Sequence, residues 1–261
     1  MPHKPIFLTI AGIDPCGGAG IIADLRVAQS LGCFGMAAAT ALTAQDTMGV
    51  HEVWTSTYEQ ILGQAMAAML DGSPSAIKVG MLGNADAARA VCQALSASAS
   101  RNIVVDTILK ATSGAALFNS PDKQWFTEVM KQARVITPNL PEAHTMLGDD
   151  SLQAESAVRK LSRLCSGASV YLKGGHADGS EVTDTFYNAE ADRIVTLSQP
   201  RIATPNTHGT GCTLSSALAS YLALGHELDD AARLANEFMH RALVNSRDYR
   251  LGAGAGPAFV E

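Results

Sequence analysis

The sequence predicts an α/β fold with one mainly parallel sheet covered by helices on both faces. Along most of the chain, short and continuously apolar runs alternate with longer segments of helical periodicity. Such apolar runs are typical of strands buried on both faces, which belong to parallel sheets. Hydrophobic residues make up 47% and charged residues 17% of the 261 residues, which is enough apolar material for a large core.

The first strand and the first helix show the pattern clearly. Residues 5–11 form an apolar run of strand length that ends in a turn containing Gly12, Asp14 and Pro15. In residues 19–31, apolar side chains such as Ile21 and Leu25 recur at helical spacing. Further strands are expected at residues 35–42, 50–55, 77–81, 103–106, 135–137 and 169–173. Helices are expected between several of them, at residues 58–70, 85–95, 123–132 and 152–164.

The C-terminal part departs from this alternation. Residues 182–187 and 193–197 predict a two-stranded hairpin added to the sheet, and residues 213–224 and 228–245 predict two helices over one face. Between the predicted elements we find no Pro/Gly/Ser-rich linker, internal repeat or low-complexity tract that would mark a boundary. We therefore predict a single domain over residues 1–261.

Charge and hydropathy argue against two classes of partner. The chain has 19 Lys and Arg against 25 Asp and Glu, so its formal net charge is −6. Nucleic-acid binding relies on clustered basic residues, so this balance argues against it. No apolar run approaches the roughly 18 residues of a membrane span. The apolar stretch at residues 6–10 is also too short for a secretion signal and enters a turn, so we interpret it as an internal strand.

The five cysteines are an odd number, widely spaced and without a C-x-x-C pair. This pattern indicates neither a disulfide framework nor a zinc site. Reduced thiols of a cytoplasmic protein are the simplest interpretation.

The strongest functional signal is the segment NTHGTGCT at residues 206–213, which opens a predicted helix. Gly209 and Gly211 allow a tight turn and a close ligand. The amides of residues 209–212 can then point into one concavity at the positive end of the helix, which favours an anion such as a phosphoryl group in transit. The alternative is a glycine-rich turn leading into a capped helix.

Cys212 falls at the start of the same helix. A thiolate there should be stabilised by the helix dipole, which would make Cys212 a usable base or nucleophile. The alternative is a small buried apolar residue, which is the usual place of a free cysteine.

The loop at residues 11–20 is rich in glycine but lacks the dinucleotide-binding spacing G-x-G-x-x-G. A substrate loop with close backbone approach fits better, with the Asp24 carboxylate one helical turn beyond it; the alternative is a plain turn before a helix. Gln45 extends the strand at residues 35–42, and its amide can donate to and accept from a pyrimidine or pyridine edge. A Gln that only caps a loop is the alternative. Met81 lies at a strand end, where it could form the floor of a pocket.

Polar residues follow three other predicted strands. Asp106 follows one strand, and Asn139 and Glu142 follow the next, so their oxygens could hold Mg²⁺ directly or through water. Asn-x-x-Glu also fits an ordinary helix N-cap with an acid in the first turn. Lys173 ends an otherwise apolar strand, where its charge could neutralise a nucleotide phosphate. A solvated loop lysine is the alternative.

Six segments in this order resemble the bacterial hydroxymethylpyrimidine/phosphomethylpyrimidine kinases of thiamine biosynthesis, which are ribokinase-like. The segments are TIAGIDPCGGAG at 9–20, ALTAQ at 41–45, KVGML at 78–82, ITPNLPE at 136–142, LKGGH at 172–176 and NTHGTGCT at 206–213. The resemblance covers nearly the whole chain. It implies a ribokinase-like three-layer α/β/α sandwich and an ATP-dependent kinase. The expected substrates are 4-amino-5-hydroxymethyl-2-methylpyrimidine and its monophosphate, and a homodimer is also implied.

The resemblance also assigns roles to residues at matching positions. Cys212 would be the catalytic base, and the anion hole would be Gly209, Thr210 and Gly211. The residues that would contact ATP are Lys173, Asn139 and Thr207, and those that would organise Mg²⁺ are Asp106 and Glu142. The residues that would line the pyrimidine pocket are Gly12, Asp24, Gln45, Met81 and Ile108.

The chain departs from the family pattern at several places. Ile13 stands where the family usually has Ser or Thr, Cys16 where it has Ser, and Ala115 where it more often has an acid. The segment at residues 252–257 keeps the family's glycines and proline but lacks its histidines. Ile13 and Ala115 bear on substrate choice, so a pyridoxal kinase of the same fold is an alternative. A non-catalytic pyrimidine-sensing module is a second alternative, and a nicotinamide oxidoreductase is disfavoured by the glycine spacing.

Overall fold

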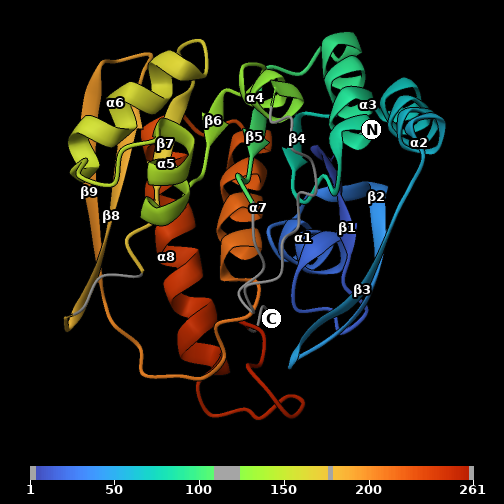
Figure 1. Cartoon of the computed structure of the whole chain (residues 1–261). Coiled ribbons are helices and arrows are strands. Elements are labelled where there is room, and N and C mark those ends of the chain that lie inside the picture. The colour runs from blue at the N-terminus through green and yellow to red at the C-terminus, as the bar shows by residue number, and fades with distance from the viewer. Residues whose placement is uncertain (1–3, 109–123, 176–178, 259–261) are drawn as a thin grey trace.

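The computed structural model describes residues 4–108, 124–175 and 179–258. Its centre is one sheet of nine strands in the order β3-β2-β1-β4-β5-β6-β7-β8-β9 (Figure 1). The strands are β1 (Ile6–Ile13), β2 (Phe34–Asp46), β3 (Gly49–Thr55), β4 (Ala76–Val79), β5 (Ile103–Val105), β6 (Val135–Ile136), β7 (Ser169–Leu172), β8 (Glu181–Asn188) and β9 (Arg193–Pro200).

The middle of the sheet is parallel and its two edges are antiparallel. Strand β1 pairs in parallel with β2 and β4, and the parallel pairing continues through β5 and β6 to β7. Strand β3 is added to β2, and the hairpin of β8 and β9 to β7, by antiparallel pairing. The mainly parallel sheet and the added hairpin predicted from the sequence are confirmed.

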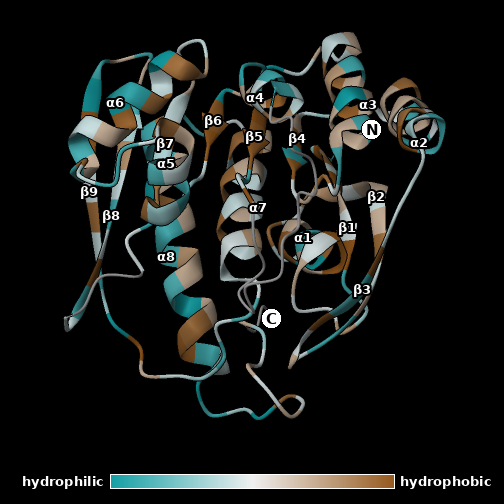
Figure 2. Cartoon of the chain, viewed as in Figure 1, coloured by the Kyte–Doolittle hydropathy of each residue, from teal (hydrophilic) through white to brown (hydrophobic). Residues whose placement is uncertain are grey.

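Helices cover both faces of the sheet, which gives three layers. The helices on one face are α1 (Gly20–Ser30), α7 (Thr210–Ala223) and α8 (Leu228–Ser246), and those on the other are α2 (Tyr58–Gly72), α3 (Ala85–Ala97), α4 (Gln124–Met130), α5 (Leu140–Leu147) and α6 (Ala154–Leu164). Strand β1 serves both layers because its side chains alternate: Phe7 packs with the first set, and Leu8 and Ile10 with the second. Figure 2 shows apolar residues concentrated in the inner strands and polar residues on the outer sides of the helices.

Several elements differ from the predicted bounds, and three of the differences lie near the carboxyl edge of the sheet. Helix α5 was expected only as the alternative interpretation of Asn139 and Glu142, because only Ala143 of its eight residues is buried and so short a helix shows no clear periodicity. Strand β2 runs on to Asp46, since its extension pairs with β3. Helix α7 begins at Thr210 instead of residue 213, because Gly209 already acts as its N-cap.

The parallel strands place their carboxyl ends at one edge of the sheet, as doubly covered parallel sheets require. Asp106 directly follows β5, and Lys173 directly follows β7. Helix α7 begins against this edge, because the Oγ atom of Ser215 in its second turn donates to Asp106. Within the described ranges, every helix is too short or too polar to cross a bilayer.

Candidate active site

The surroundings of Gly209 require a glycine at the start of α7, and those of Gly211 leave little room for a larger residue. Gly209 has a φ of 73°, in the left-handed region that favours glycine, and a Cβ there would collide with the carbonyl oxygen of Gly18. A Cβ on Gly211 would lie 3.3 Å from Lys173 Nζ. The start of α7 is therefore packed against the β1–α1 loop and beside the Lys173 ammonium, at the positive end of the helix dipole.

Lys173 and Asp106 form an ion pair beneath this helix end. Nζ lies 3.0 Å from Asp106 Oδ1, which also accepts a hydrogen bond from Thr137 Oγ1. Burial alone would raise the pKa of Asp106, but Lys173 and Lys78 outweigh it and lower the pKa. The side chain of Lys173 keeps 18% of its surface exposed, and its ammonium lies close to Gly211 in the first turn of α7.

Asn139 and Glu142 form a capping box at the start of α5. Asn139 Oδ1 accepts from the Glu142 amide and Glu142 Oε2 from the Asn139 amide, both at 2.8 Å. Thr107 Oγ1 also donates to Oε2 at 3.3 Å. Burial raises the pKa of Glu142; Lys173 opposes this shift and Asp106 adds to it. The helix-cap interpretation is therefore confirmed, and the same carboxylate lies within the field of the ion pair.

Cys212 lies in the first turn of α7 and its side chain is buried. Burial raises the pKa of the thiol to about 11; Lys78 opposes this shift, and Asp24 and Asp106 add to it. The helix dipole alone predicted a lowered pKa, and this direction is wrong for the ligand-free protein. The reason is desolvation: the thiolate loses water that a dipole does not replace.

Asp24 does not face a pocket. Its carboxylate is fully buried, and both oxygens lie 2.9 Å from Nζ of the equally buried Lys78. Thr9 Oγ1 and Ser216 Oγ donate to it at 2.6 and 2.7 Å. The structure thus corrects the predicted pocket-lining place of Asp24, whose oxygens are all used inside the protein. The sequence signal for this network was Lys78 itself, a lysine in an otherwise apolar buried strand, which needs a partner there.

The other residues predicted to line the pyrimidine pocket lie near the carboxyl edge. A Cβ on Gly12 would lie 3.1 Å from Met81 Sδ, so these two residues are in contact. Gln45 Oε1 accepts from Thr43 Oγ1 at 3.4 Å. Ile108 is half-buried just after Asp106.

Two further predictions concern single positions. Thr207, predicted to contact ATP, is exposed, and its carbonyl oxygen accepts from Thr210 Oγ1 at 3.2 Å. Ala115 lies outside the described residues.

Comparison with known proteins places the chain in a family. Residues 14–259 match the phosphomethylpyrimidine kinase family. The chain belongs to this family. It is 40% identical to the hydroxymethylpyrimidine/phosphomethylpyrimidine kinase of Rhizobium meliloti over 257 residues, covering 97% of this chain and 95% of the relative. It is 35% identical to the thiamine biosynthesis multifunctional protein ThiED of Corynebacterium efficiens, and spans only 35% of that longer protein.

Solved structures agree with the family. The pyridoxal kinase of Staphylococcus aureus in complex with ADP superposes with a TM-score of 0.87 at 30% identity, covering 99% of this chain and 94% of that one. The phosphomethylpyrimidine kinase of Clostridium difficile superposes with a TM-score of 0.79 at 32% identity, covering 92% and 100%. The predicted family, its ribokinase-like fold and kinase activity are therefore confirmed.

Sequence reasoning missed Asp184, a residue that holds the backbone next to Lys173. The Gly174 amide, next to Lys173, donates to Asp184 Oδ1 at 2.7 Å. Tyr171 Oη and Asn236 Nδ2 donate to Asp184 Oδ2 at 2.7 and 3.0 Å. This buried network fixes the backbone that carries Lys173. Asp184 lies in an edge hairpin far along the chain, and no pattern in the sequence linked it to the site.

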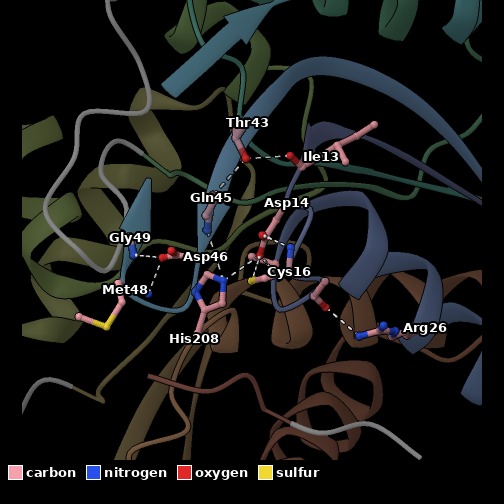
Figure 3. A network of polar contacts seen from close by, with 12 residues as sticks. Ile13, Asp14, Cys16, Arg26, Thr43, Gln45, Asp46, Met48, Gly49 and His208 are labelled. Atoms are coloured by element: carbon pink, nitrogen blue, oxygen red, sulfur yellow. Dashed lines mark hydrogen bonds and ion pairs between the residues drawn. The ribbon is translucent and has the colours of Figure 1, made fainter. Parts of the chain in front are cut away.

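A second missed group surrounds His208. His208 Nε2 lies 2.8 Å from Asp14 Oδ2 and 3.3 Å from Gln45 Nε2 (Figure 3). Cys16 Sγ donates to the same Asp14 oxygen at 3.2 Å. A cavity of about 750 Å³ borders this group and is lined by Cys16, Arg26, Asp46, Thr213, Leu251 and Pro257 among others. The sequence had left His208 without a role, because its partners lie near the other end of the chain.

Proposed function

We propose that the chain is an ATP-dependent kinase of thiamine biosynthesis. Its substrates would be 4-amino-5-hydroxymethyl-2-methylpyrimidine, phosphorylated on the hydroxymethyl oxygen, and then the resulting monophosphate. The observation that carries this proposal is the start of α7, where Gly211 lies against the Lys173–Asp106 ion pair and Cys212 lies one residue further on. Amides, an ammonium and a proton acceptor at one helix end are the parts that phosphoryl transfer needs.

The proposed chemistry is an in-line transfer. The hydroxymethyl oxygen attacks the γ-phosphorus, the bond from that phosphorus to the bridging oxygen breaks, and ADP leaves. Cys212, as the thiolate, takes the hydroxyl proton. The amides of Gly209 to Cys212 and the Lys173 ammonium stabilise the charge that grows on the transferred group. Because the pKa of Cys212 is about 11 in the free protein, the thiolate is a minor form near neutral pH.

The donor set at the carboxyl edge fits Mg²⁺. Asp106 and Glu142 supply hard carboxylate oxygens, the kind that Mg²⁺ prefers. Two carboxylates against the single ammonium of Lys173 leave one net negative charge when all three are ionised. These two residues would hold the ion, which would neutralise phosphate charge when bound. Asn139, the N-cap of α5, and Thr207, in the loop before α7, would contact ATP.

A pyridoxal kinase activity is the second candidate, because the S. aureus pyridoxal kinase has a TM-score of 0.87 with this chain. Ile13, where the family usually has Ser or Thr, removes a hydroxyl near the substrate loop. The purified protein should be assayed for ADP release with ATP and each alcohol in turn. We expect kcat/KM for the pyrimidine to exceed that for pyridoxal by at least about tenfold. The reverse preference would favour the pyridoxal kinase, and no ADP release with either alcohol would favour a sensing module.

We also propose that the protein is a cytoplasmic homodimer. Leu42 and Trp54 are cross-strand partners on the β2–β3 hairpin, with 51% and 50% of their surfaces exposed, and Met48 at the hairpin turn is 63% exposed. Apolar residues gathered on an exposed edge hairpin are typical of an interface. Light scattering should report a dimer for the wild type and a monomer for Trp54→Glu.

The free state of all five cysteines fits a reducing compartment. The partners we propose are small molecules, not nucleic acid or a membrane.

A further inference from the structure

Three potential metal ligands that the proposed phosphoryl transfer does not use lie together beside the cavity. They are Asp14 Oδ2, Cys16 Sγ and His208 Nε2, and all three atoms lie within 4.8 Å of one another. Asp14 and His208 are 194 residues apart, which is why the sequence did not indicate a metal site at these residues. The close approach of the β1–α1 loop to the start of α7 brings them together (Figure 3).

The hydrogen bonds of this group converge on one atom. Asp14 Oδ2 lies 2.8 Å from His208 Nε2 and 3.2 Å from Cys16 Sγ, and it also accepts from the Ala19 amide at 2.9 Å. Burial alone would raise the pKa of Asp14, but the contacts with His208 and Cys16 outweigh it and lower the pKa. This oxygen therefore accepts from the Cys16 thiol and the Ala19 amide and lies beside a ring nitrogen of His208.

The distances between these ligand atoms suit a tetrahedrally coordinated cation after a small movement of the side chains. Zinc bonds of about 2.0–2.3 Å to nitrogen, oxygen and sulfur place neighbouring ligand atoms about 3.3–3.5 Å apart. The separation of 2.8 Å between Asp14 Oδ2 and His208 Nε2 would need to widen by at least about 0.5 Å, and that of 3.2 Å between Asp14 Oδ2 and Cys16 Sγ by up to about 0.3 Å. The cavity beside Cys16 offers room for a water as the fourth ligand.

We propose that Asp14, Cys16 and His208 form a binding site for a thiophilic divalent metal ion, with Zn²⁺ as its occupant. A thiolate and an imidazole select zinc over magnesium, which prefers oxygen ligands. This site is therefore separate from the magnesium site proposed at Asp106. On binding, the thiol proton of Cys16 passes to solvent, and His208 keeps one proton on Nδ1. One dication then meets two anionic ligands and leaves no net charge.

Charged and polar groups surround the Cys16 thiol. Burial raises the pKa of Cys16 to about 11, and the hydrogen bond to Asp14 adds to this shift. The other charged groups around it are His208 before α7, Asp46 at the end of β2 and Arg26 of α1, which donates to the backbone of the same loop at 2.8 Å.

Zinc at this site should weaken pyrimidine binding, a consequence that rests on the proposed function. Gln45 Nε2 lies 3.3 Å from the ring nitrogen that the metal would take. A cation on that nitrogen repels the amide NH₂, so Gln45 must turn away from His208. Because Gln45 is the proposed pyrimidine contact, zinc should raise KM for the pyrimidine and leave KM for ATP unchanged.

The test uses metal binding by the whole purified protein. Titration calorimetry should find one Zn²⁺ per chain, and Co²⁺ should produce an ultraviolet thiolate-to-metal charge-transfer band. Cys16→Ser restores the residue usual in the family, so it should keep kinase activity. It should lose the cobalt band and bind zinc at least about 100-fold more weakly, since a ligand should matter no less than an outer-shell partner. Cys212→Ser, the matched control, should keep the band.

Two results would overturn the site. One is wild-type protein that gives no thiolate–cobalt band, and the other is Cys16→Ser protein that binds zinc as tightly as wild type. Zinc inhibition that is competitive with ATP would overturn the link to Gln45. The cobalt band is read without catalysis, so a failure of the proposed kinase function leaves this test intact.

Discussion

The buried Asp24–Lys78 pair beneath the start of α7 allows a quantitative test of what holds the site together. Both side chains are fully buried, and the Lys78 ammonium lies 2.9 Å from each carboxylate oxygen. Removing one partner leaves the other charge buried and uncompensated, which costs about 3–5 kcal/mol. We therefore expect Lys78→Met to lower the free energy of unfolding by that amount, and Asp24→Asn to lower it by a similar or somewhat smaller amount.

The double variant separates a pair from two independent residues. With both charges removed, the uncompensated charge disappears, so Asp24→Asn/Lys78→Met should cost at least about 2 kcal/mol less than the two single losses added together. Urea denaturation followed by far-ultraviolet circular dichroism measures all four proteins. If the loss of the double variant equals the sum of the two single losses to within about 0.5 kcal/mol, the two residues are not coupled and the reasoning is refuted.

Three further predictions concern the helix start. Gly209→Ala should lower the free energy of unfolding by at least about 1–3 kcal/mol in a urea titration, because φ is 73° and the new Cβ would collide with Gly18; an unchanged midpoint contradicts this. Gly211→Ala should lower kcat by up to about 100-fold in steady-state kinetics, because its Cβ would lie 3.3 Å from Lys173 Nζ and displace it, whereas an unchanged kcat would remove that requirement. Because the pKa of Cys212 is about 11 and a base must lose its proton, kcat/KM should rise about tenfold per unit from about pH 6 to about pH 9, and a plateau near neutrality is the opposing result.

The sequence was sufficient to predict the layers of the fold and the edge of the sheet that carries the candidate site residues. Continuous apolar runs predicted parallel strands, and parallel strands place whatever follows them at one edge. Asp106 and Lys173 were therefore expected at the same edge, where the structure shows them 3.0 Å apart. The glycines of α7 were predicted for the same kind of reason, because a tight turn and a close approach are local demands that a single residue type meets.

Partners far apart in the chain could not be predicted. Asp24 meets Lys78 across 54 residues, and a carboxylate one turn into a helix looks the same in the sequence whether it faces a ligand or the core. The predicted direction of the pKa shift of Cys212 was wrong for a related reason. Its position at a helix start is local and lowers the pKa, whereas burial depends on the whole tertiary structure and raises it.

The kinetics of a Cys212 variant test the central claim most directly. In Cys212→Ala, the amides of α7 and the Lys173 ammonium remain, so the affinity for a non-hydrolysable ATP analogue should stay close to that of wild type. Turnover of the pyrimidine alcohol should fall by about 100-fold to 10,000-fold, the usual contribution of a positioned base. A kcat close to that of wild type would show that the sulfur at residue 212 does not accept the proton of the acceptor alcohol.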